Sequence, residues 1–135
     1  MIHINEIGKG DERFDDIIHR FPDSWPAFIS VGWGWADLVL ECHNRLVAFD
    51  ENYKVLQIKQ KFGGLRYYFT PSHPAYTKYM SAKLVDLEKR SYLVCEICGQ
   101  PGNLRTKQQP RYLQALCVEH SPDDQGYMSA STIHV

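Results

Sequence analysis

The chain has 135 residues, of which 44% are hydrophobic and 13% aromatic, and its formal net charge is −1. This composition can bury a core and excludes a disordered chain, and the longest apolar run is far shorter than the roughly 20 residues that span a bilayer. No basic stretch followed by an apolar segment opens the sequence, so a cytoplasmic protein with no membrane part is expected. In that compartment the four cysteines favour a metal site over disulfides.

Charge is distributed unevenly along the chain. Residues 1–53 carry ten acids and four bases, whereas residues 54–116 carry eleven bases and three acids. Three acids in residues 117–135 restore the overall balance. This split favours complementary packing of the two halves, and the alternative is a bipolar surface that meets a polyanion on its basic side.

Two amphipathic helices are predicted in the first part of the chain. Residues 11–20 carry apolar side chains at helical spacing and acids in the first turn, and Pro22 ends the pattern. The second helix is predicted over residues 35–49. Its expected buried stripe consists of Trp35, Leu38, Val39, Cys42, Leu46 and Phe49. Cys42 is therefore interpreted as a buried free thiol, whereas His43 falls on the polar side of the same helix.

A β-hairpin gives the clearest strand signal. Two alternating runs, residues 55–62 and 65–69, flank a Gly-Gly pair at positions 63–64. Both glycines are expected to adopt the positive φ that a tight hairpin turn requires. Strict alternation assigns Val55 and Ile58 to opposite faces of the first strand.

A third, continuous helix is predicted over residues 75–92 and leads directly into Cys95. Its expected apolar side consists of Tyr76, Tyr79, Met80, Leu84, Leu87 and Tyr92. The following segment, residues 99–110, is rich in Pro, Gly and Gln and is expected to be a loop.

Two ligand pairs predict a metal site in the last third of the chain. Cys95 and Cys98 are three residues apart and precede Gly99, which is typical of a zinc knuckle. Cys117 and His120 have the same spacing, and two such pairs around a short loop are typical of zinc sites. The four ligands complete a tetrahedral Cys3His set, so one structural Zn²⁺ with no open coordination position is predicted. An iron–sulfur cluster is the less favoured alternative.

These elements predict an α+β protein made of two parts. Residues 1–92 form a small core with the β-hairpin at about 54–69 and the long helix at about 75–92. Residues 93–135 form a zinc-binding module and tail, packed on the core as one unit. The order of ligands and loops favours a treble-clef-like finger, and a ribbon-like site with two knuckles is the alternative.

Known catalytic motifs are missing from the sequence. An HNH-type nuclease on such a finger needs a histidine base, but the histidines after Cys98 are His120, assigned to the metal, and His134. No deaminase signature, phosphate-binding loop or nucleophile elbow occurs. We therefore predict a protein that is not an enzyme and has no evident small-molecule substrate.

Several of these strings together resemble a known family. The run from Lys59 to Tyr68, which contains KFGGLR, precedes a long helix and then the CxxC and CxxH pairs. This order resembles a family of small uncharacterised proteins of bacteria, phages and prophages, over about Gly32 to His120. The resemblance implies that hairpin and zinc module form one unit and that the protein belongs to a mobile genetic element. Small phage proteins of this type often bind host proteins, including defence proteins.

Two functions follow from these features. The favoured hypothesis is a zinc-stabilised module that binds a larger protein partner, since Tyr and Trp are common interface anchors. The alternative is a nucleic-acid-binding zinc finger, in which bases and aromatic rings on the hairpin and the metal loop contact phosphates and stack on bases. The candidate surface for either function consists of Lys54, Lys59, Lys61, Arg66, Tyr67, Tyr68, Arg105, Lys107, Arg111 and Tyr112.

Overall fold

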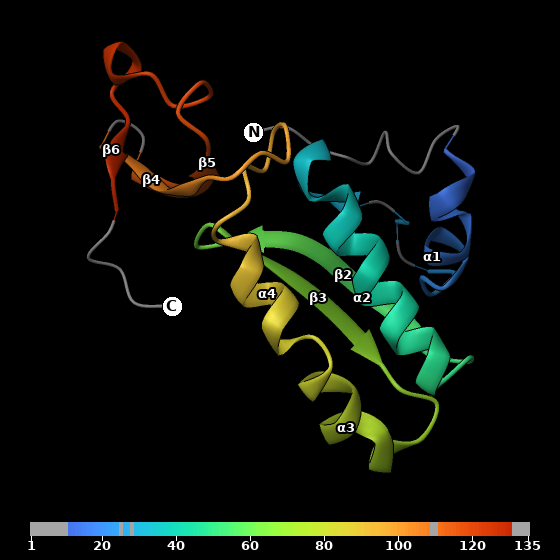
Figure 1. Ribbon diagram of the computed structural model, residues 1–135. Coiled ribbons are helices and arrows are strands. Elements are labelled where there is room, and N and C mark those ends of the chain that lie inside the picture. The colour runs from blue at the N-terminus through green and yellow to red at the C-terminus, as the bar shows by residue number, and fades with distance from the viewer. Residues whose placement is uncertain (1–10, 25, 28, 109–110, 131–135) are drawn as a thin grey trace.

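The computed structural model, which describes residues 11–24, 26–27, 29–108 and 111–130, has an α+β fold with two small sheets (Figure 1). The first sheet has the order β1-β2-β3 and consists of β1 (Ile29–Ser30), β2 (Lys54–Lys61) and β3 (Gly64–Thr70). The second has the order β5-β4-β6 and consists of β4 (Asn103–Gln108), β5 (Arg111–Leu116) and β6 (Met128–Ser129). The predicted fold class is confirmed.

Helices gather around the first sheet, whereas the second sheet forms a separate end of the molecule (Figure 1). The α-helices are α1 (Asp15–His19), α2 (Ala36–Phe49), α3 (Thr77–Ala82) and α4 (Val85–Ser91). Short 3-10 helices are η1 (Glu12–Phe14), η2 (Trp33–Trp35), η3 (Pro74–Tyr76) and η4 (Asp123–Gln125). Among the described residues no helix is long and apolar enough to cross a membrane.

The first two predicted helices are confirmed. Asp11 caps η1 by accepting a hydrogen bond from the Arg13 N–H at 3.1 Å, and Phe14 and Ile17 are fully buried. Along α2 the expected stripe is buried except for its last member, Phe49, which is 42% exposed. Cys42 is buried as predicted, and burial raises the pKa of its thiol well above the ordinary value.

The hairpin between β2 and β3 is confirmed, but its turn lies one residue earlier than predicted. Lys61 pairs with Gly64, so the two central residues are Phe62 and Gly63, with φ of 54° and 84°. Positive φ at both positions is the type I′ geometry that suits a two-residue hairpin. Gly64 has a different role, because a Cβ there would lie 2.3 Å from Cζ of Tyr92.

A β-bulge in β2 overturns the strict alternation expected from the sequence. The register with β3 shifts between Val55 and Gln57, which leaves one extra residue on β2. After the shift Val55 and Ile58 face the same side, and both are fully buried. The bulge therefore allows two apolar residues three positions apart to enter one core.

The single helix predicted over residues 75–92 is wrong, because it is divided into α3 and α4 at Lys83–Leu84. The freed Lys83 carbonyl accepts a hydrogen bond from Arg45 Nη1 at 2.9 Å. Arg45 Nη1 also lies 2.6 Å from Asp86 Oδ1. The division keeps Leu84 buried beside the core. Two of the expected apolar residues, Tyr76 and Tyr79, are instead exposed.

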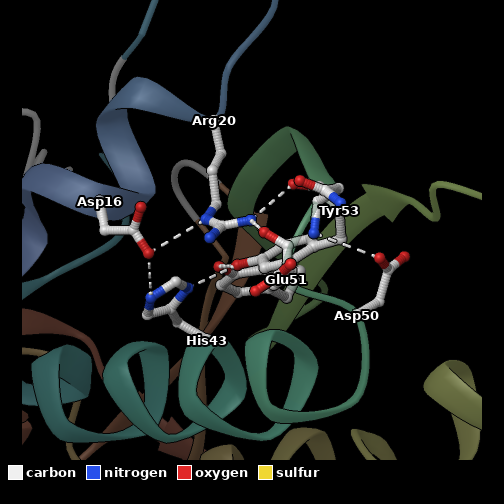
Figure 2. A network of polar contacts seen from close by, with 8 residues as sticks. Asp16, Arg20, His43, Asp50, Glu51 and Tyr53 are labelled. Atoms are coloured by element: carbon white, nitrogen blue, oxygen red, sulfur yellow. Dashed lines mark hydrogen bonds and ion pairs between the residues drawn. The ribbon is translucent and has the colours of Figure 1, made fainter.

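A polar network joins α1, α2 and the first sheet (Figure 2). His43, expected on a polar surface, is only 7% exposed; its Nε2 lies 2.9 Å from Asp16 Oδ2 and its Nδ1 lies 2.8 Å from the Tyr53 hydroxyl. The Tyr53 hydroxyl in turn lies 2.7 Å from that of Tyr67. Burial lowers the pKa of His43, which Asp16 partly opposes. A neutral imidazole with its proton on Nε2 satisfies this chain of hydrogen bonds.

Arg20 closes the network on the side of α1. Its Nη1 donates to the carbonyl oxygens of Glu51 and Tyr53 at 2.8 and 2.9 Å, and its guanidinium lies 4.7 Å from the centre of the Tyr53 ring (Figure 2). Asp50 holds the adjacent loop by accepting hydrogen bonds from the N–H and hydroxyl of Ser72. The Tyr53 side chain at the centre of this network is fully buried.

Candidate metal centre

Cys95, Cys98, Cys117 and His120 meet in one cluster, as the sequence predicts, and their ligand atoms all lie within 4.8 Å of one another. Sγ of Cys98 and Sγ of Cys117 are 3.7 Å apart, and Sγ of Cys95 is 3.7 Å from Nδ1 of His120. A tetrahedral zinc site with Zn–S bonds of about 2.3 Å and Zn–N bonds of about 2.0 Å has edges of about 3.5–3.8 Å. The separation between Cys117 Sγ and His120 Nδ1, 3.1 Å, is shorter. Three sulfurs and one imidazole nitrogen therefore fit one tetrahedral metal ion.

The first ligand pair lies in a tight turn whose backbone favours thiolate. The Gly99 N–H donates to the Cys95 carbonyl at 2.9 Å, and Gly99 has a φ of 83°, where a side chain would be strained. Burial opposes ionisation of Cys95, but backbone N–H groups of Cys117, Cys98 and Ile97 act on its sulfur and lower its pKa to about 7. Because metals bind the thiolate, this environment prepares Cys95 as a ligand.

Two glycines before α2 form the surface on which this turn rests. The Gly34 N–H donates to the Glu96 carbonyl at 2.7 Å, and the Gly32 N–H donates to the Glu96 carboxylate at 2.9 Å. A Cβ on Gly34 would lie 2.0 Å from the Cys95 carbonyl oxygen, and one on Gly32 would lie 2.2 Å from that of Glu96. Sequence reasoning missed this contact. Its signal in the sequence was the run Gly32-Trp33-Gly34, in which two residues lack the side chain that would collide with the backbone of Cys95 and Glu96.

Further contacts attach the metal turn to both parts of the molecule. The indole N–H of Trp35, which is fully buried in the main core, donates to the Val94 carbonyl at 2.9 Å. The Glu96 N–H donates to the Ala115 carbonyl at 2.8 Å, which links the turn to β5. Glu96 is 3% exposed, and burial raises its pKa to about 7. The metal cluster is thus continuous with the fold on two sides.

The second ligand pair lies in a turn after β5, where the Ser121 hydroxyl donates to the Cys117 carbonyl at 2.7 Å. Within residues 121–130 the helical element is the short 3-10 helix η4, which starts after His120. The treble-clef interpretation, which needs a helix opened by this pair, is therefore not confirmed. The expectation of a loop over residues 99–110 is wrong for residues 103–108, which form β4 and pair antiparallel with β5. Two turns flanking a hairpin are closer to the ribbon-like alternative.

Some of the predicted binding residues of the β2–β3 hairpin lie together on one face of the sheet. By the β2–β3 register Lys59 pairs with Arg66, and Lys61 lies further along the same face of the sheet. Tyr68 shares that face and is 38% exposed. Tyr67 does not belong to it, because this side chain points into the core and is only 3% exposed. We call the face formed by Lys59, Lys61, Arg66 and Tyr68 the basic hairpin face.

The predicted bases of the zinc module lie elsewhere. Leu104 and Leu113 approach the hairpin turn, since a Cβ on Gly63 would lie 2.5 Å from Leu104 Cδ2 and 3.4 Å from Leu113 Cβ. In the β4–β5 hairpin, Leu104 and Leu113 lie on the face toward this turn. The β4–β5 register places Arg105, Lys107 and Tyr112 on the opposite face of the β4–β5 hairpin.

The remaining bases are also apart from the basic hairpin face. On the far side of the module Lys107 Nζ lies 4.3 Å from the centre of the Tyr127 ring. Lys54 pairs with Thr70 at the end of β2 remote from the turn. The side chain of Arg111 lies outside the described part of the chain. The described bases therefore do not converge on one face.

Comparison with known proteins found no matching family model, no similar curated protein and no similar solved structure. The resemblance to a family of bacterial and phage proteins stays a prediction.

Proposed function

We propose that this chain is a non-enzymatic protein, stabilised by one structural Zn²⁺, that acts by binding another protein. The Cys3His cluster carries the first half of this proposal. Its four donors complete the tetrahedral coordination of zinc and leave no position for a substrate or an activated water. The ion, when bound, supplies cross-linking between the Cys95 turn and the turn after β5, and binding energy of this kind is folding energy.

The basic hairpin face supports the second half. Among the salt bridges of the described residues none involves Lys59 or Lys61. At the adjoining turn Phe62 is 67% exposed, and Lys61 Nζ lies 5.6 Å from the centre of its ring. An exposed aromatic ring beside unpaired lysines suits a partner surface that combines acidic groups with an apolar anchor point.

The resemblance in sequence supports a particular kind of partner. If the chain belongs to a phage or another mobile element, the partner is a protein of the host cytoplasm, for which host defence proteins are the leading candidates. A nucleic-acid partner is the alternative, because the same lysines could contact phosphates. The separation of the hairpin bases from Arg105 and Lys107 favours the protein partner, since the described bases form no continuous track for phosphates.

A capture experiment tests this proposal with matched variants. The zinc-loaded full chain is used to capture partners from the cytoplasm of its native host, beside Lys59→Glu/Lys61→Glu and, as the control, Lys54→Glu/Lys78→Glu. We expect a stoichiometric protein partner that the hairpin variant loses and the control retains. Tight binding of generic DNA or RNA at low salt, with no protein partner, would establish the alternative instead. Equal capture by all three proteins would contradict the assignment of the surface.

A further inference from the structure

The edge of β3 that faces away from β2 is only half covered. In an antiparallel pair the residues alternate between those bonded to the partner strand and those whose N–H and C=O point outward. Leu65 and Tyr67 point outward, because their N–H groups donate to Ser91 Oγ at 2.8 Å and to Glu88 Oε2 at 3.4 Å. Both acceptors belong to α4, which packs along this edge (Figure 1). Side chains of α4 therefore take the place of a neighbouring strand over the first half of β3.

In the described part of the chain no helix side chain accepts a hydrogen bond from the second half of this edge. The two-residue period places the N–H and C=O of Phe69 on the edge beside those of Tyr67. A continuous helix over residues 75–92 would extend the cover, but the helix is interrupted at Lys83–Leu84, and α3 forms a separate segment (Figure 1). Met80 of α3 is buried in the main core. The helix break thus leaves a groove open next to Phe69.

This groove has a volume of about 360 Å³, which lies within the usual range of about 300–1,000 Å³ for ligand pockets. One wall is β3 from Arg66 to Phe69. The other wall consists of Thr77, Ser81, Leu84 and Glu88. These four residues are spaced by four, three and four positions, so they lie on one side of α3 and α4 despite the break. We call this cavity the β3-edge groove.

The chemistry of its walls matches a polypeptide backbone. A strand edge supplies a backbone donor and acceptor at Phe69, and Thr77 and Ser81 line the opposite wall of the groove. The Thr77 hydroxyl donates to the Pro74 carbonyl at 3.0 Å. Leu84 gives an apolar floor. Exposed strand edges bind extended peptides by adding them as a further strand, with side-chain pockets for specificity.

Glu88 indicates which side chain such a peptide carries. Burial raises the pKa of its carboxyl group, and its hydrogen bond from the Tyr67 N–H is long. No salt bridge joins Glu88 to a cation of the described chain. The positive charge of Arg66 acts on Glu88 and partly opposes the rise in its pKa, but the hydrogen bonds of Arg66 go to the Leu65 carbonyl and the Tyr92 hydroxyl. A cationic side chain from outside would complete the coordination of this carboxylate.

We propose that the β3-edge groove binds an extended peptide segment of a partner protein, which pairs with the backbone of Phe69 and places a Lys or Arg side chain beside Glu88. The inference deepens the proposed protein binding, on which it rests, but uses a strand edge distinct from Lys59 and Lys61. An open edge, a groove and a carboxylate that forms no salt bridge within the described chain meet at one place, and an extended basic segment suits all three.

The test uses random linear peptides displayed on a carrier and selected against the zinc-loaded full chain. Selected peptides are expected to share a Lys or Arg at one position and to shift the amide NMR signals of Tyr67–Thr70 and of α3. N-methylation of alternate peptide nitrogens should abolish binding, because it removes the strand-pairing donors. Glu88→Gln should remove the preference for the basic residue.

Matched variants locate the site. Ser81→Phe, which fills the groove, is expected to weaken binding at least about tenfold, whereas Lys78→Phe on the exposed side of α3 should leave it unchanged. The proposal is overturned if no peptide is selected, if the signals shift elsewhere, or if Ser81→Phe and N-methylation have no effect. Lys59→Glu/Lys61→Glu should retain peptide binding, so a failure of the basic hairpin face is distinguished from a failure of the groove.

Discussion

At the scale of single residues, Gly34 shows how closely the metal turn and the core approach each other. A methyl group at this position meets the Cys95 carbonyl oxygen at 2.0 Å, so Gly34→Ala must displace the turn. We expect a loss of about 3 kcal/mol in the free energy of unfolding and weaker zinc binding. Gly126→Ala is the control: its φ of 85° costs about 1–2 kcal/mol, but nothing lies within 4 Å. Chemical denaturation and zinc competition measure both effects. Unchanged zinc affinity in Gly34→Ala would contradict the contact.

His43 predicts a dependence of stability on pH. Its pKa is lowered in the folded state, chiefly by burial, so the unfolded chain binds the proton more readily. The stability of the wild type should therefore be complete above the ordinary histidine pKa of about 6.5 and fall as the pH drops through that value. His43→Gln removes this titration. Denaturation of both zinc-loaded proteins between neutral and mildly acidic pH should show the steeper loss in the wild type. Parallel curves would contradict a neutral, buried His43.

At the scale of elements, the β2–β3 turn holds a phenylalanine in a conformation that suits asparagine or glycine. Phe62 has a φ of 54° and is 67% exposed, so burial of its side chain offsets little of the backbone strain. Phe62→Asn creates the Asn-Gly pair preferred in type I′ turns and should stabilise the fold by about 1 kcal/mol. Thermal unfolding measures the gain.

The same change should weaken partner capture, because strain retained at an exposed aromatic residue points to a binding role. A destabilised variant would contradict the turn assignment.

Local elements of this fold were predictable, whereas its irregular ones were not. The hairpin, α2 and the Cys-Cys and Cys-His pairs follow from spacing within a few residues. No Gly or Pro marks the break between α3 and α4, and the carbonyl of Lys83 at the break accepts a hydrogen bond from Arg45, which lies far away in sequence. Likewise the glycine at position 64 is required by the Tyr92 ring and not by the turn. Tertiary contacts of this kind decide where regular patterns stop, and a single sequence does not display them.

At the scale of the whole molecule, the metal cluster and the core are separate clusters joined by close contacts. The main core is formed by residues of the four α-helices, η1, η2 and the first sheet, together with Ala115 from β5. Removing zinc should therefore release residues 93–130 and loosen Gly32–Trp35, while α2 and the β2–β3 hairpin keep part of their protection. Amide hydrogen exchange with and without a chelator measures this. Amide protection that is the same with and without the chelator would contradict a structural role for the metal.

Cys95, Cys98, Cys117 and His120 lie close enough to hold one metal ion, and we expect this ion to stabilise the fold. Native mass spectrometry of the purified full chain tests it most directly. We expect one zinc ion per folded chain, and loss of that ion with a shift to unfolded charge states in Cys117→Ser. Cys42→Ser serves as the control, since this cysteine lies in the main core away from the cluster, and it should keep the ion. A folded wild-type chain that carries no metal would contradict the account.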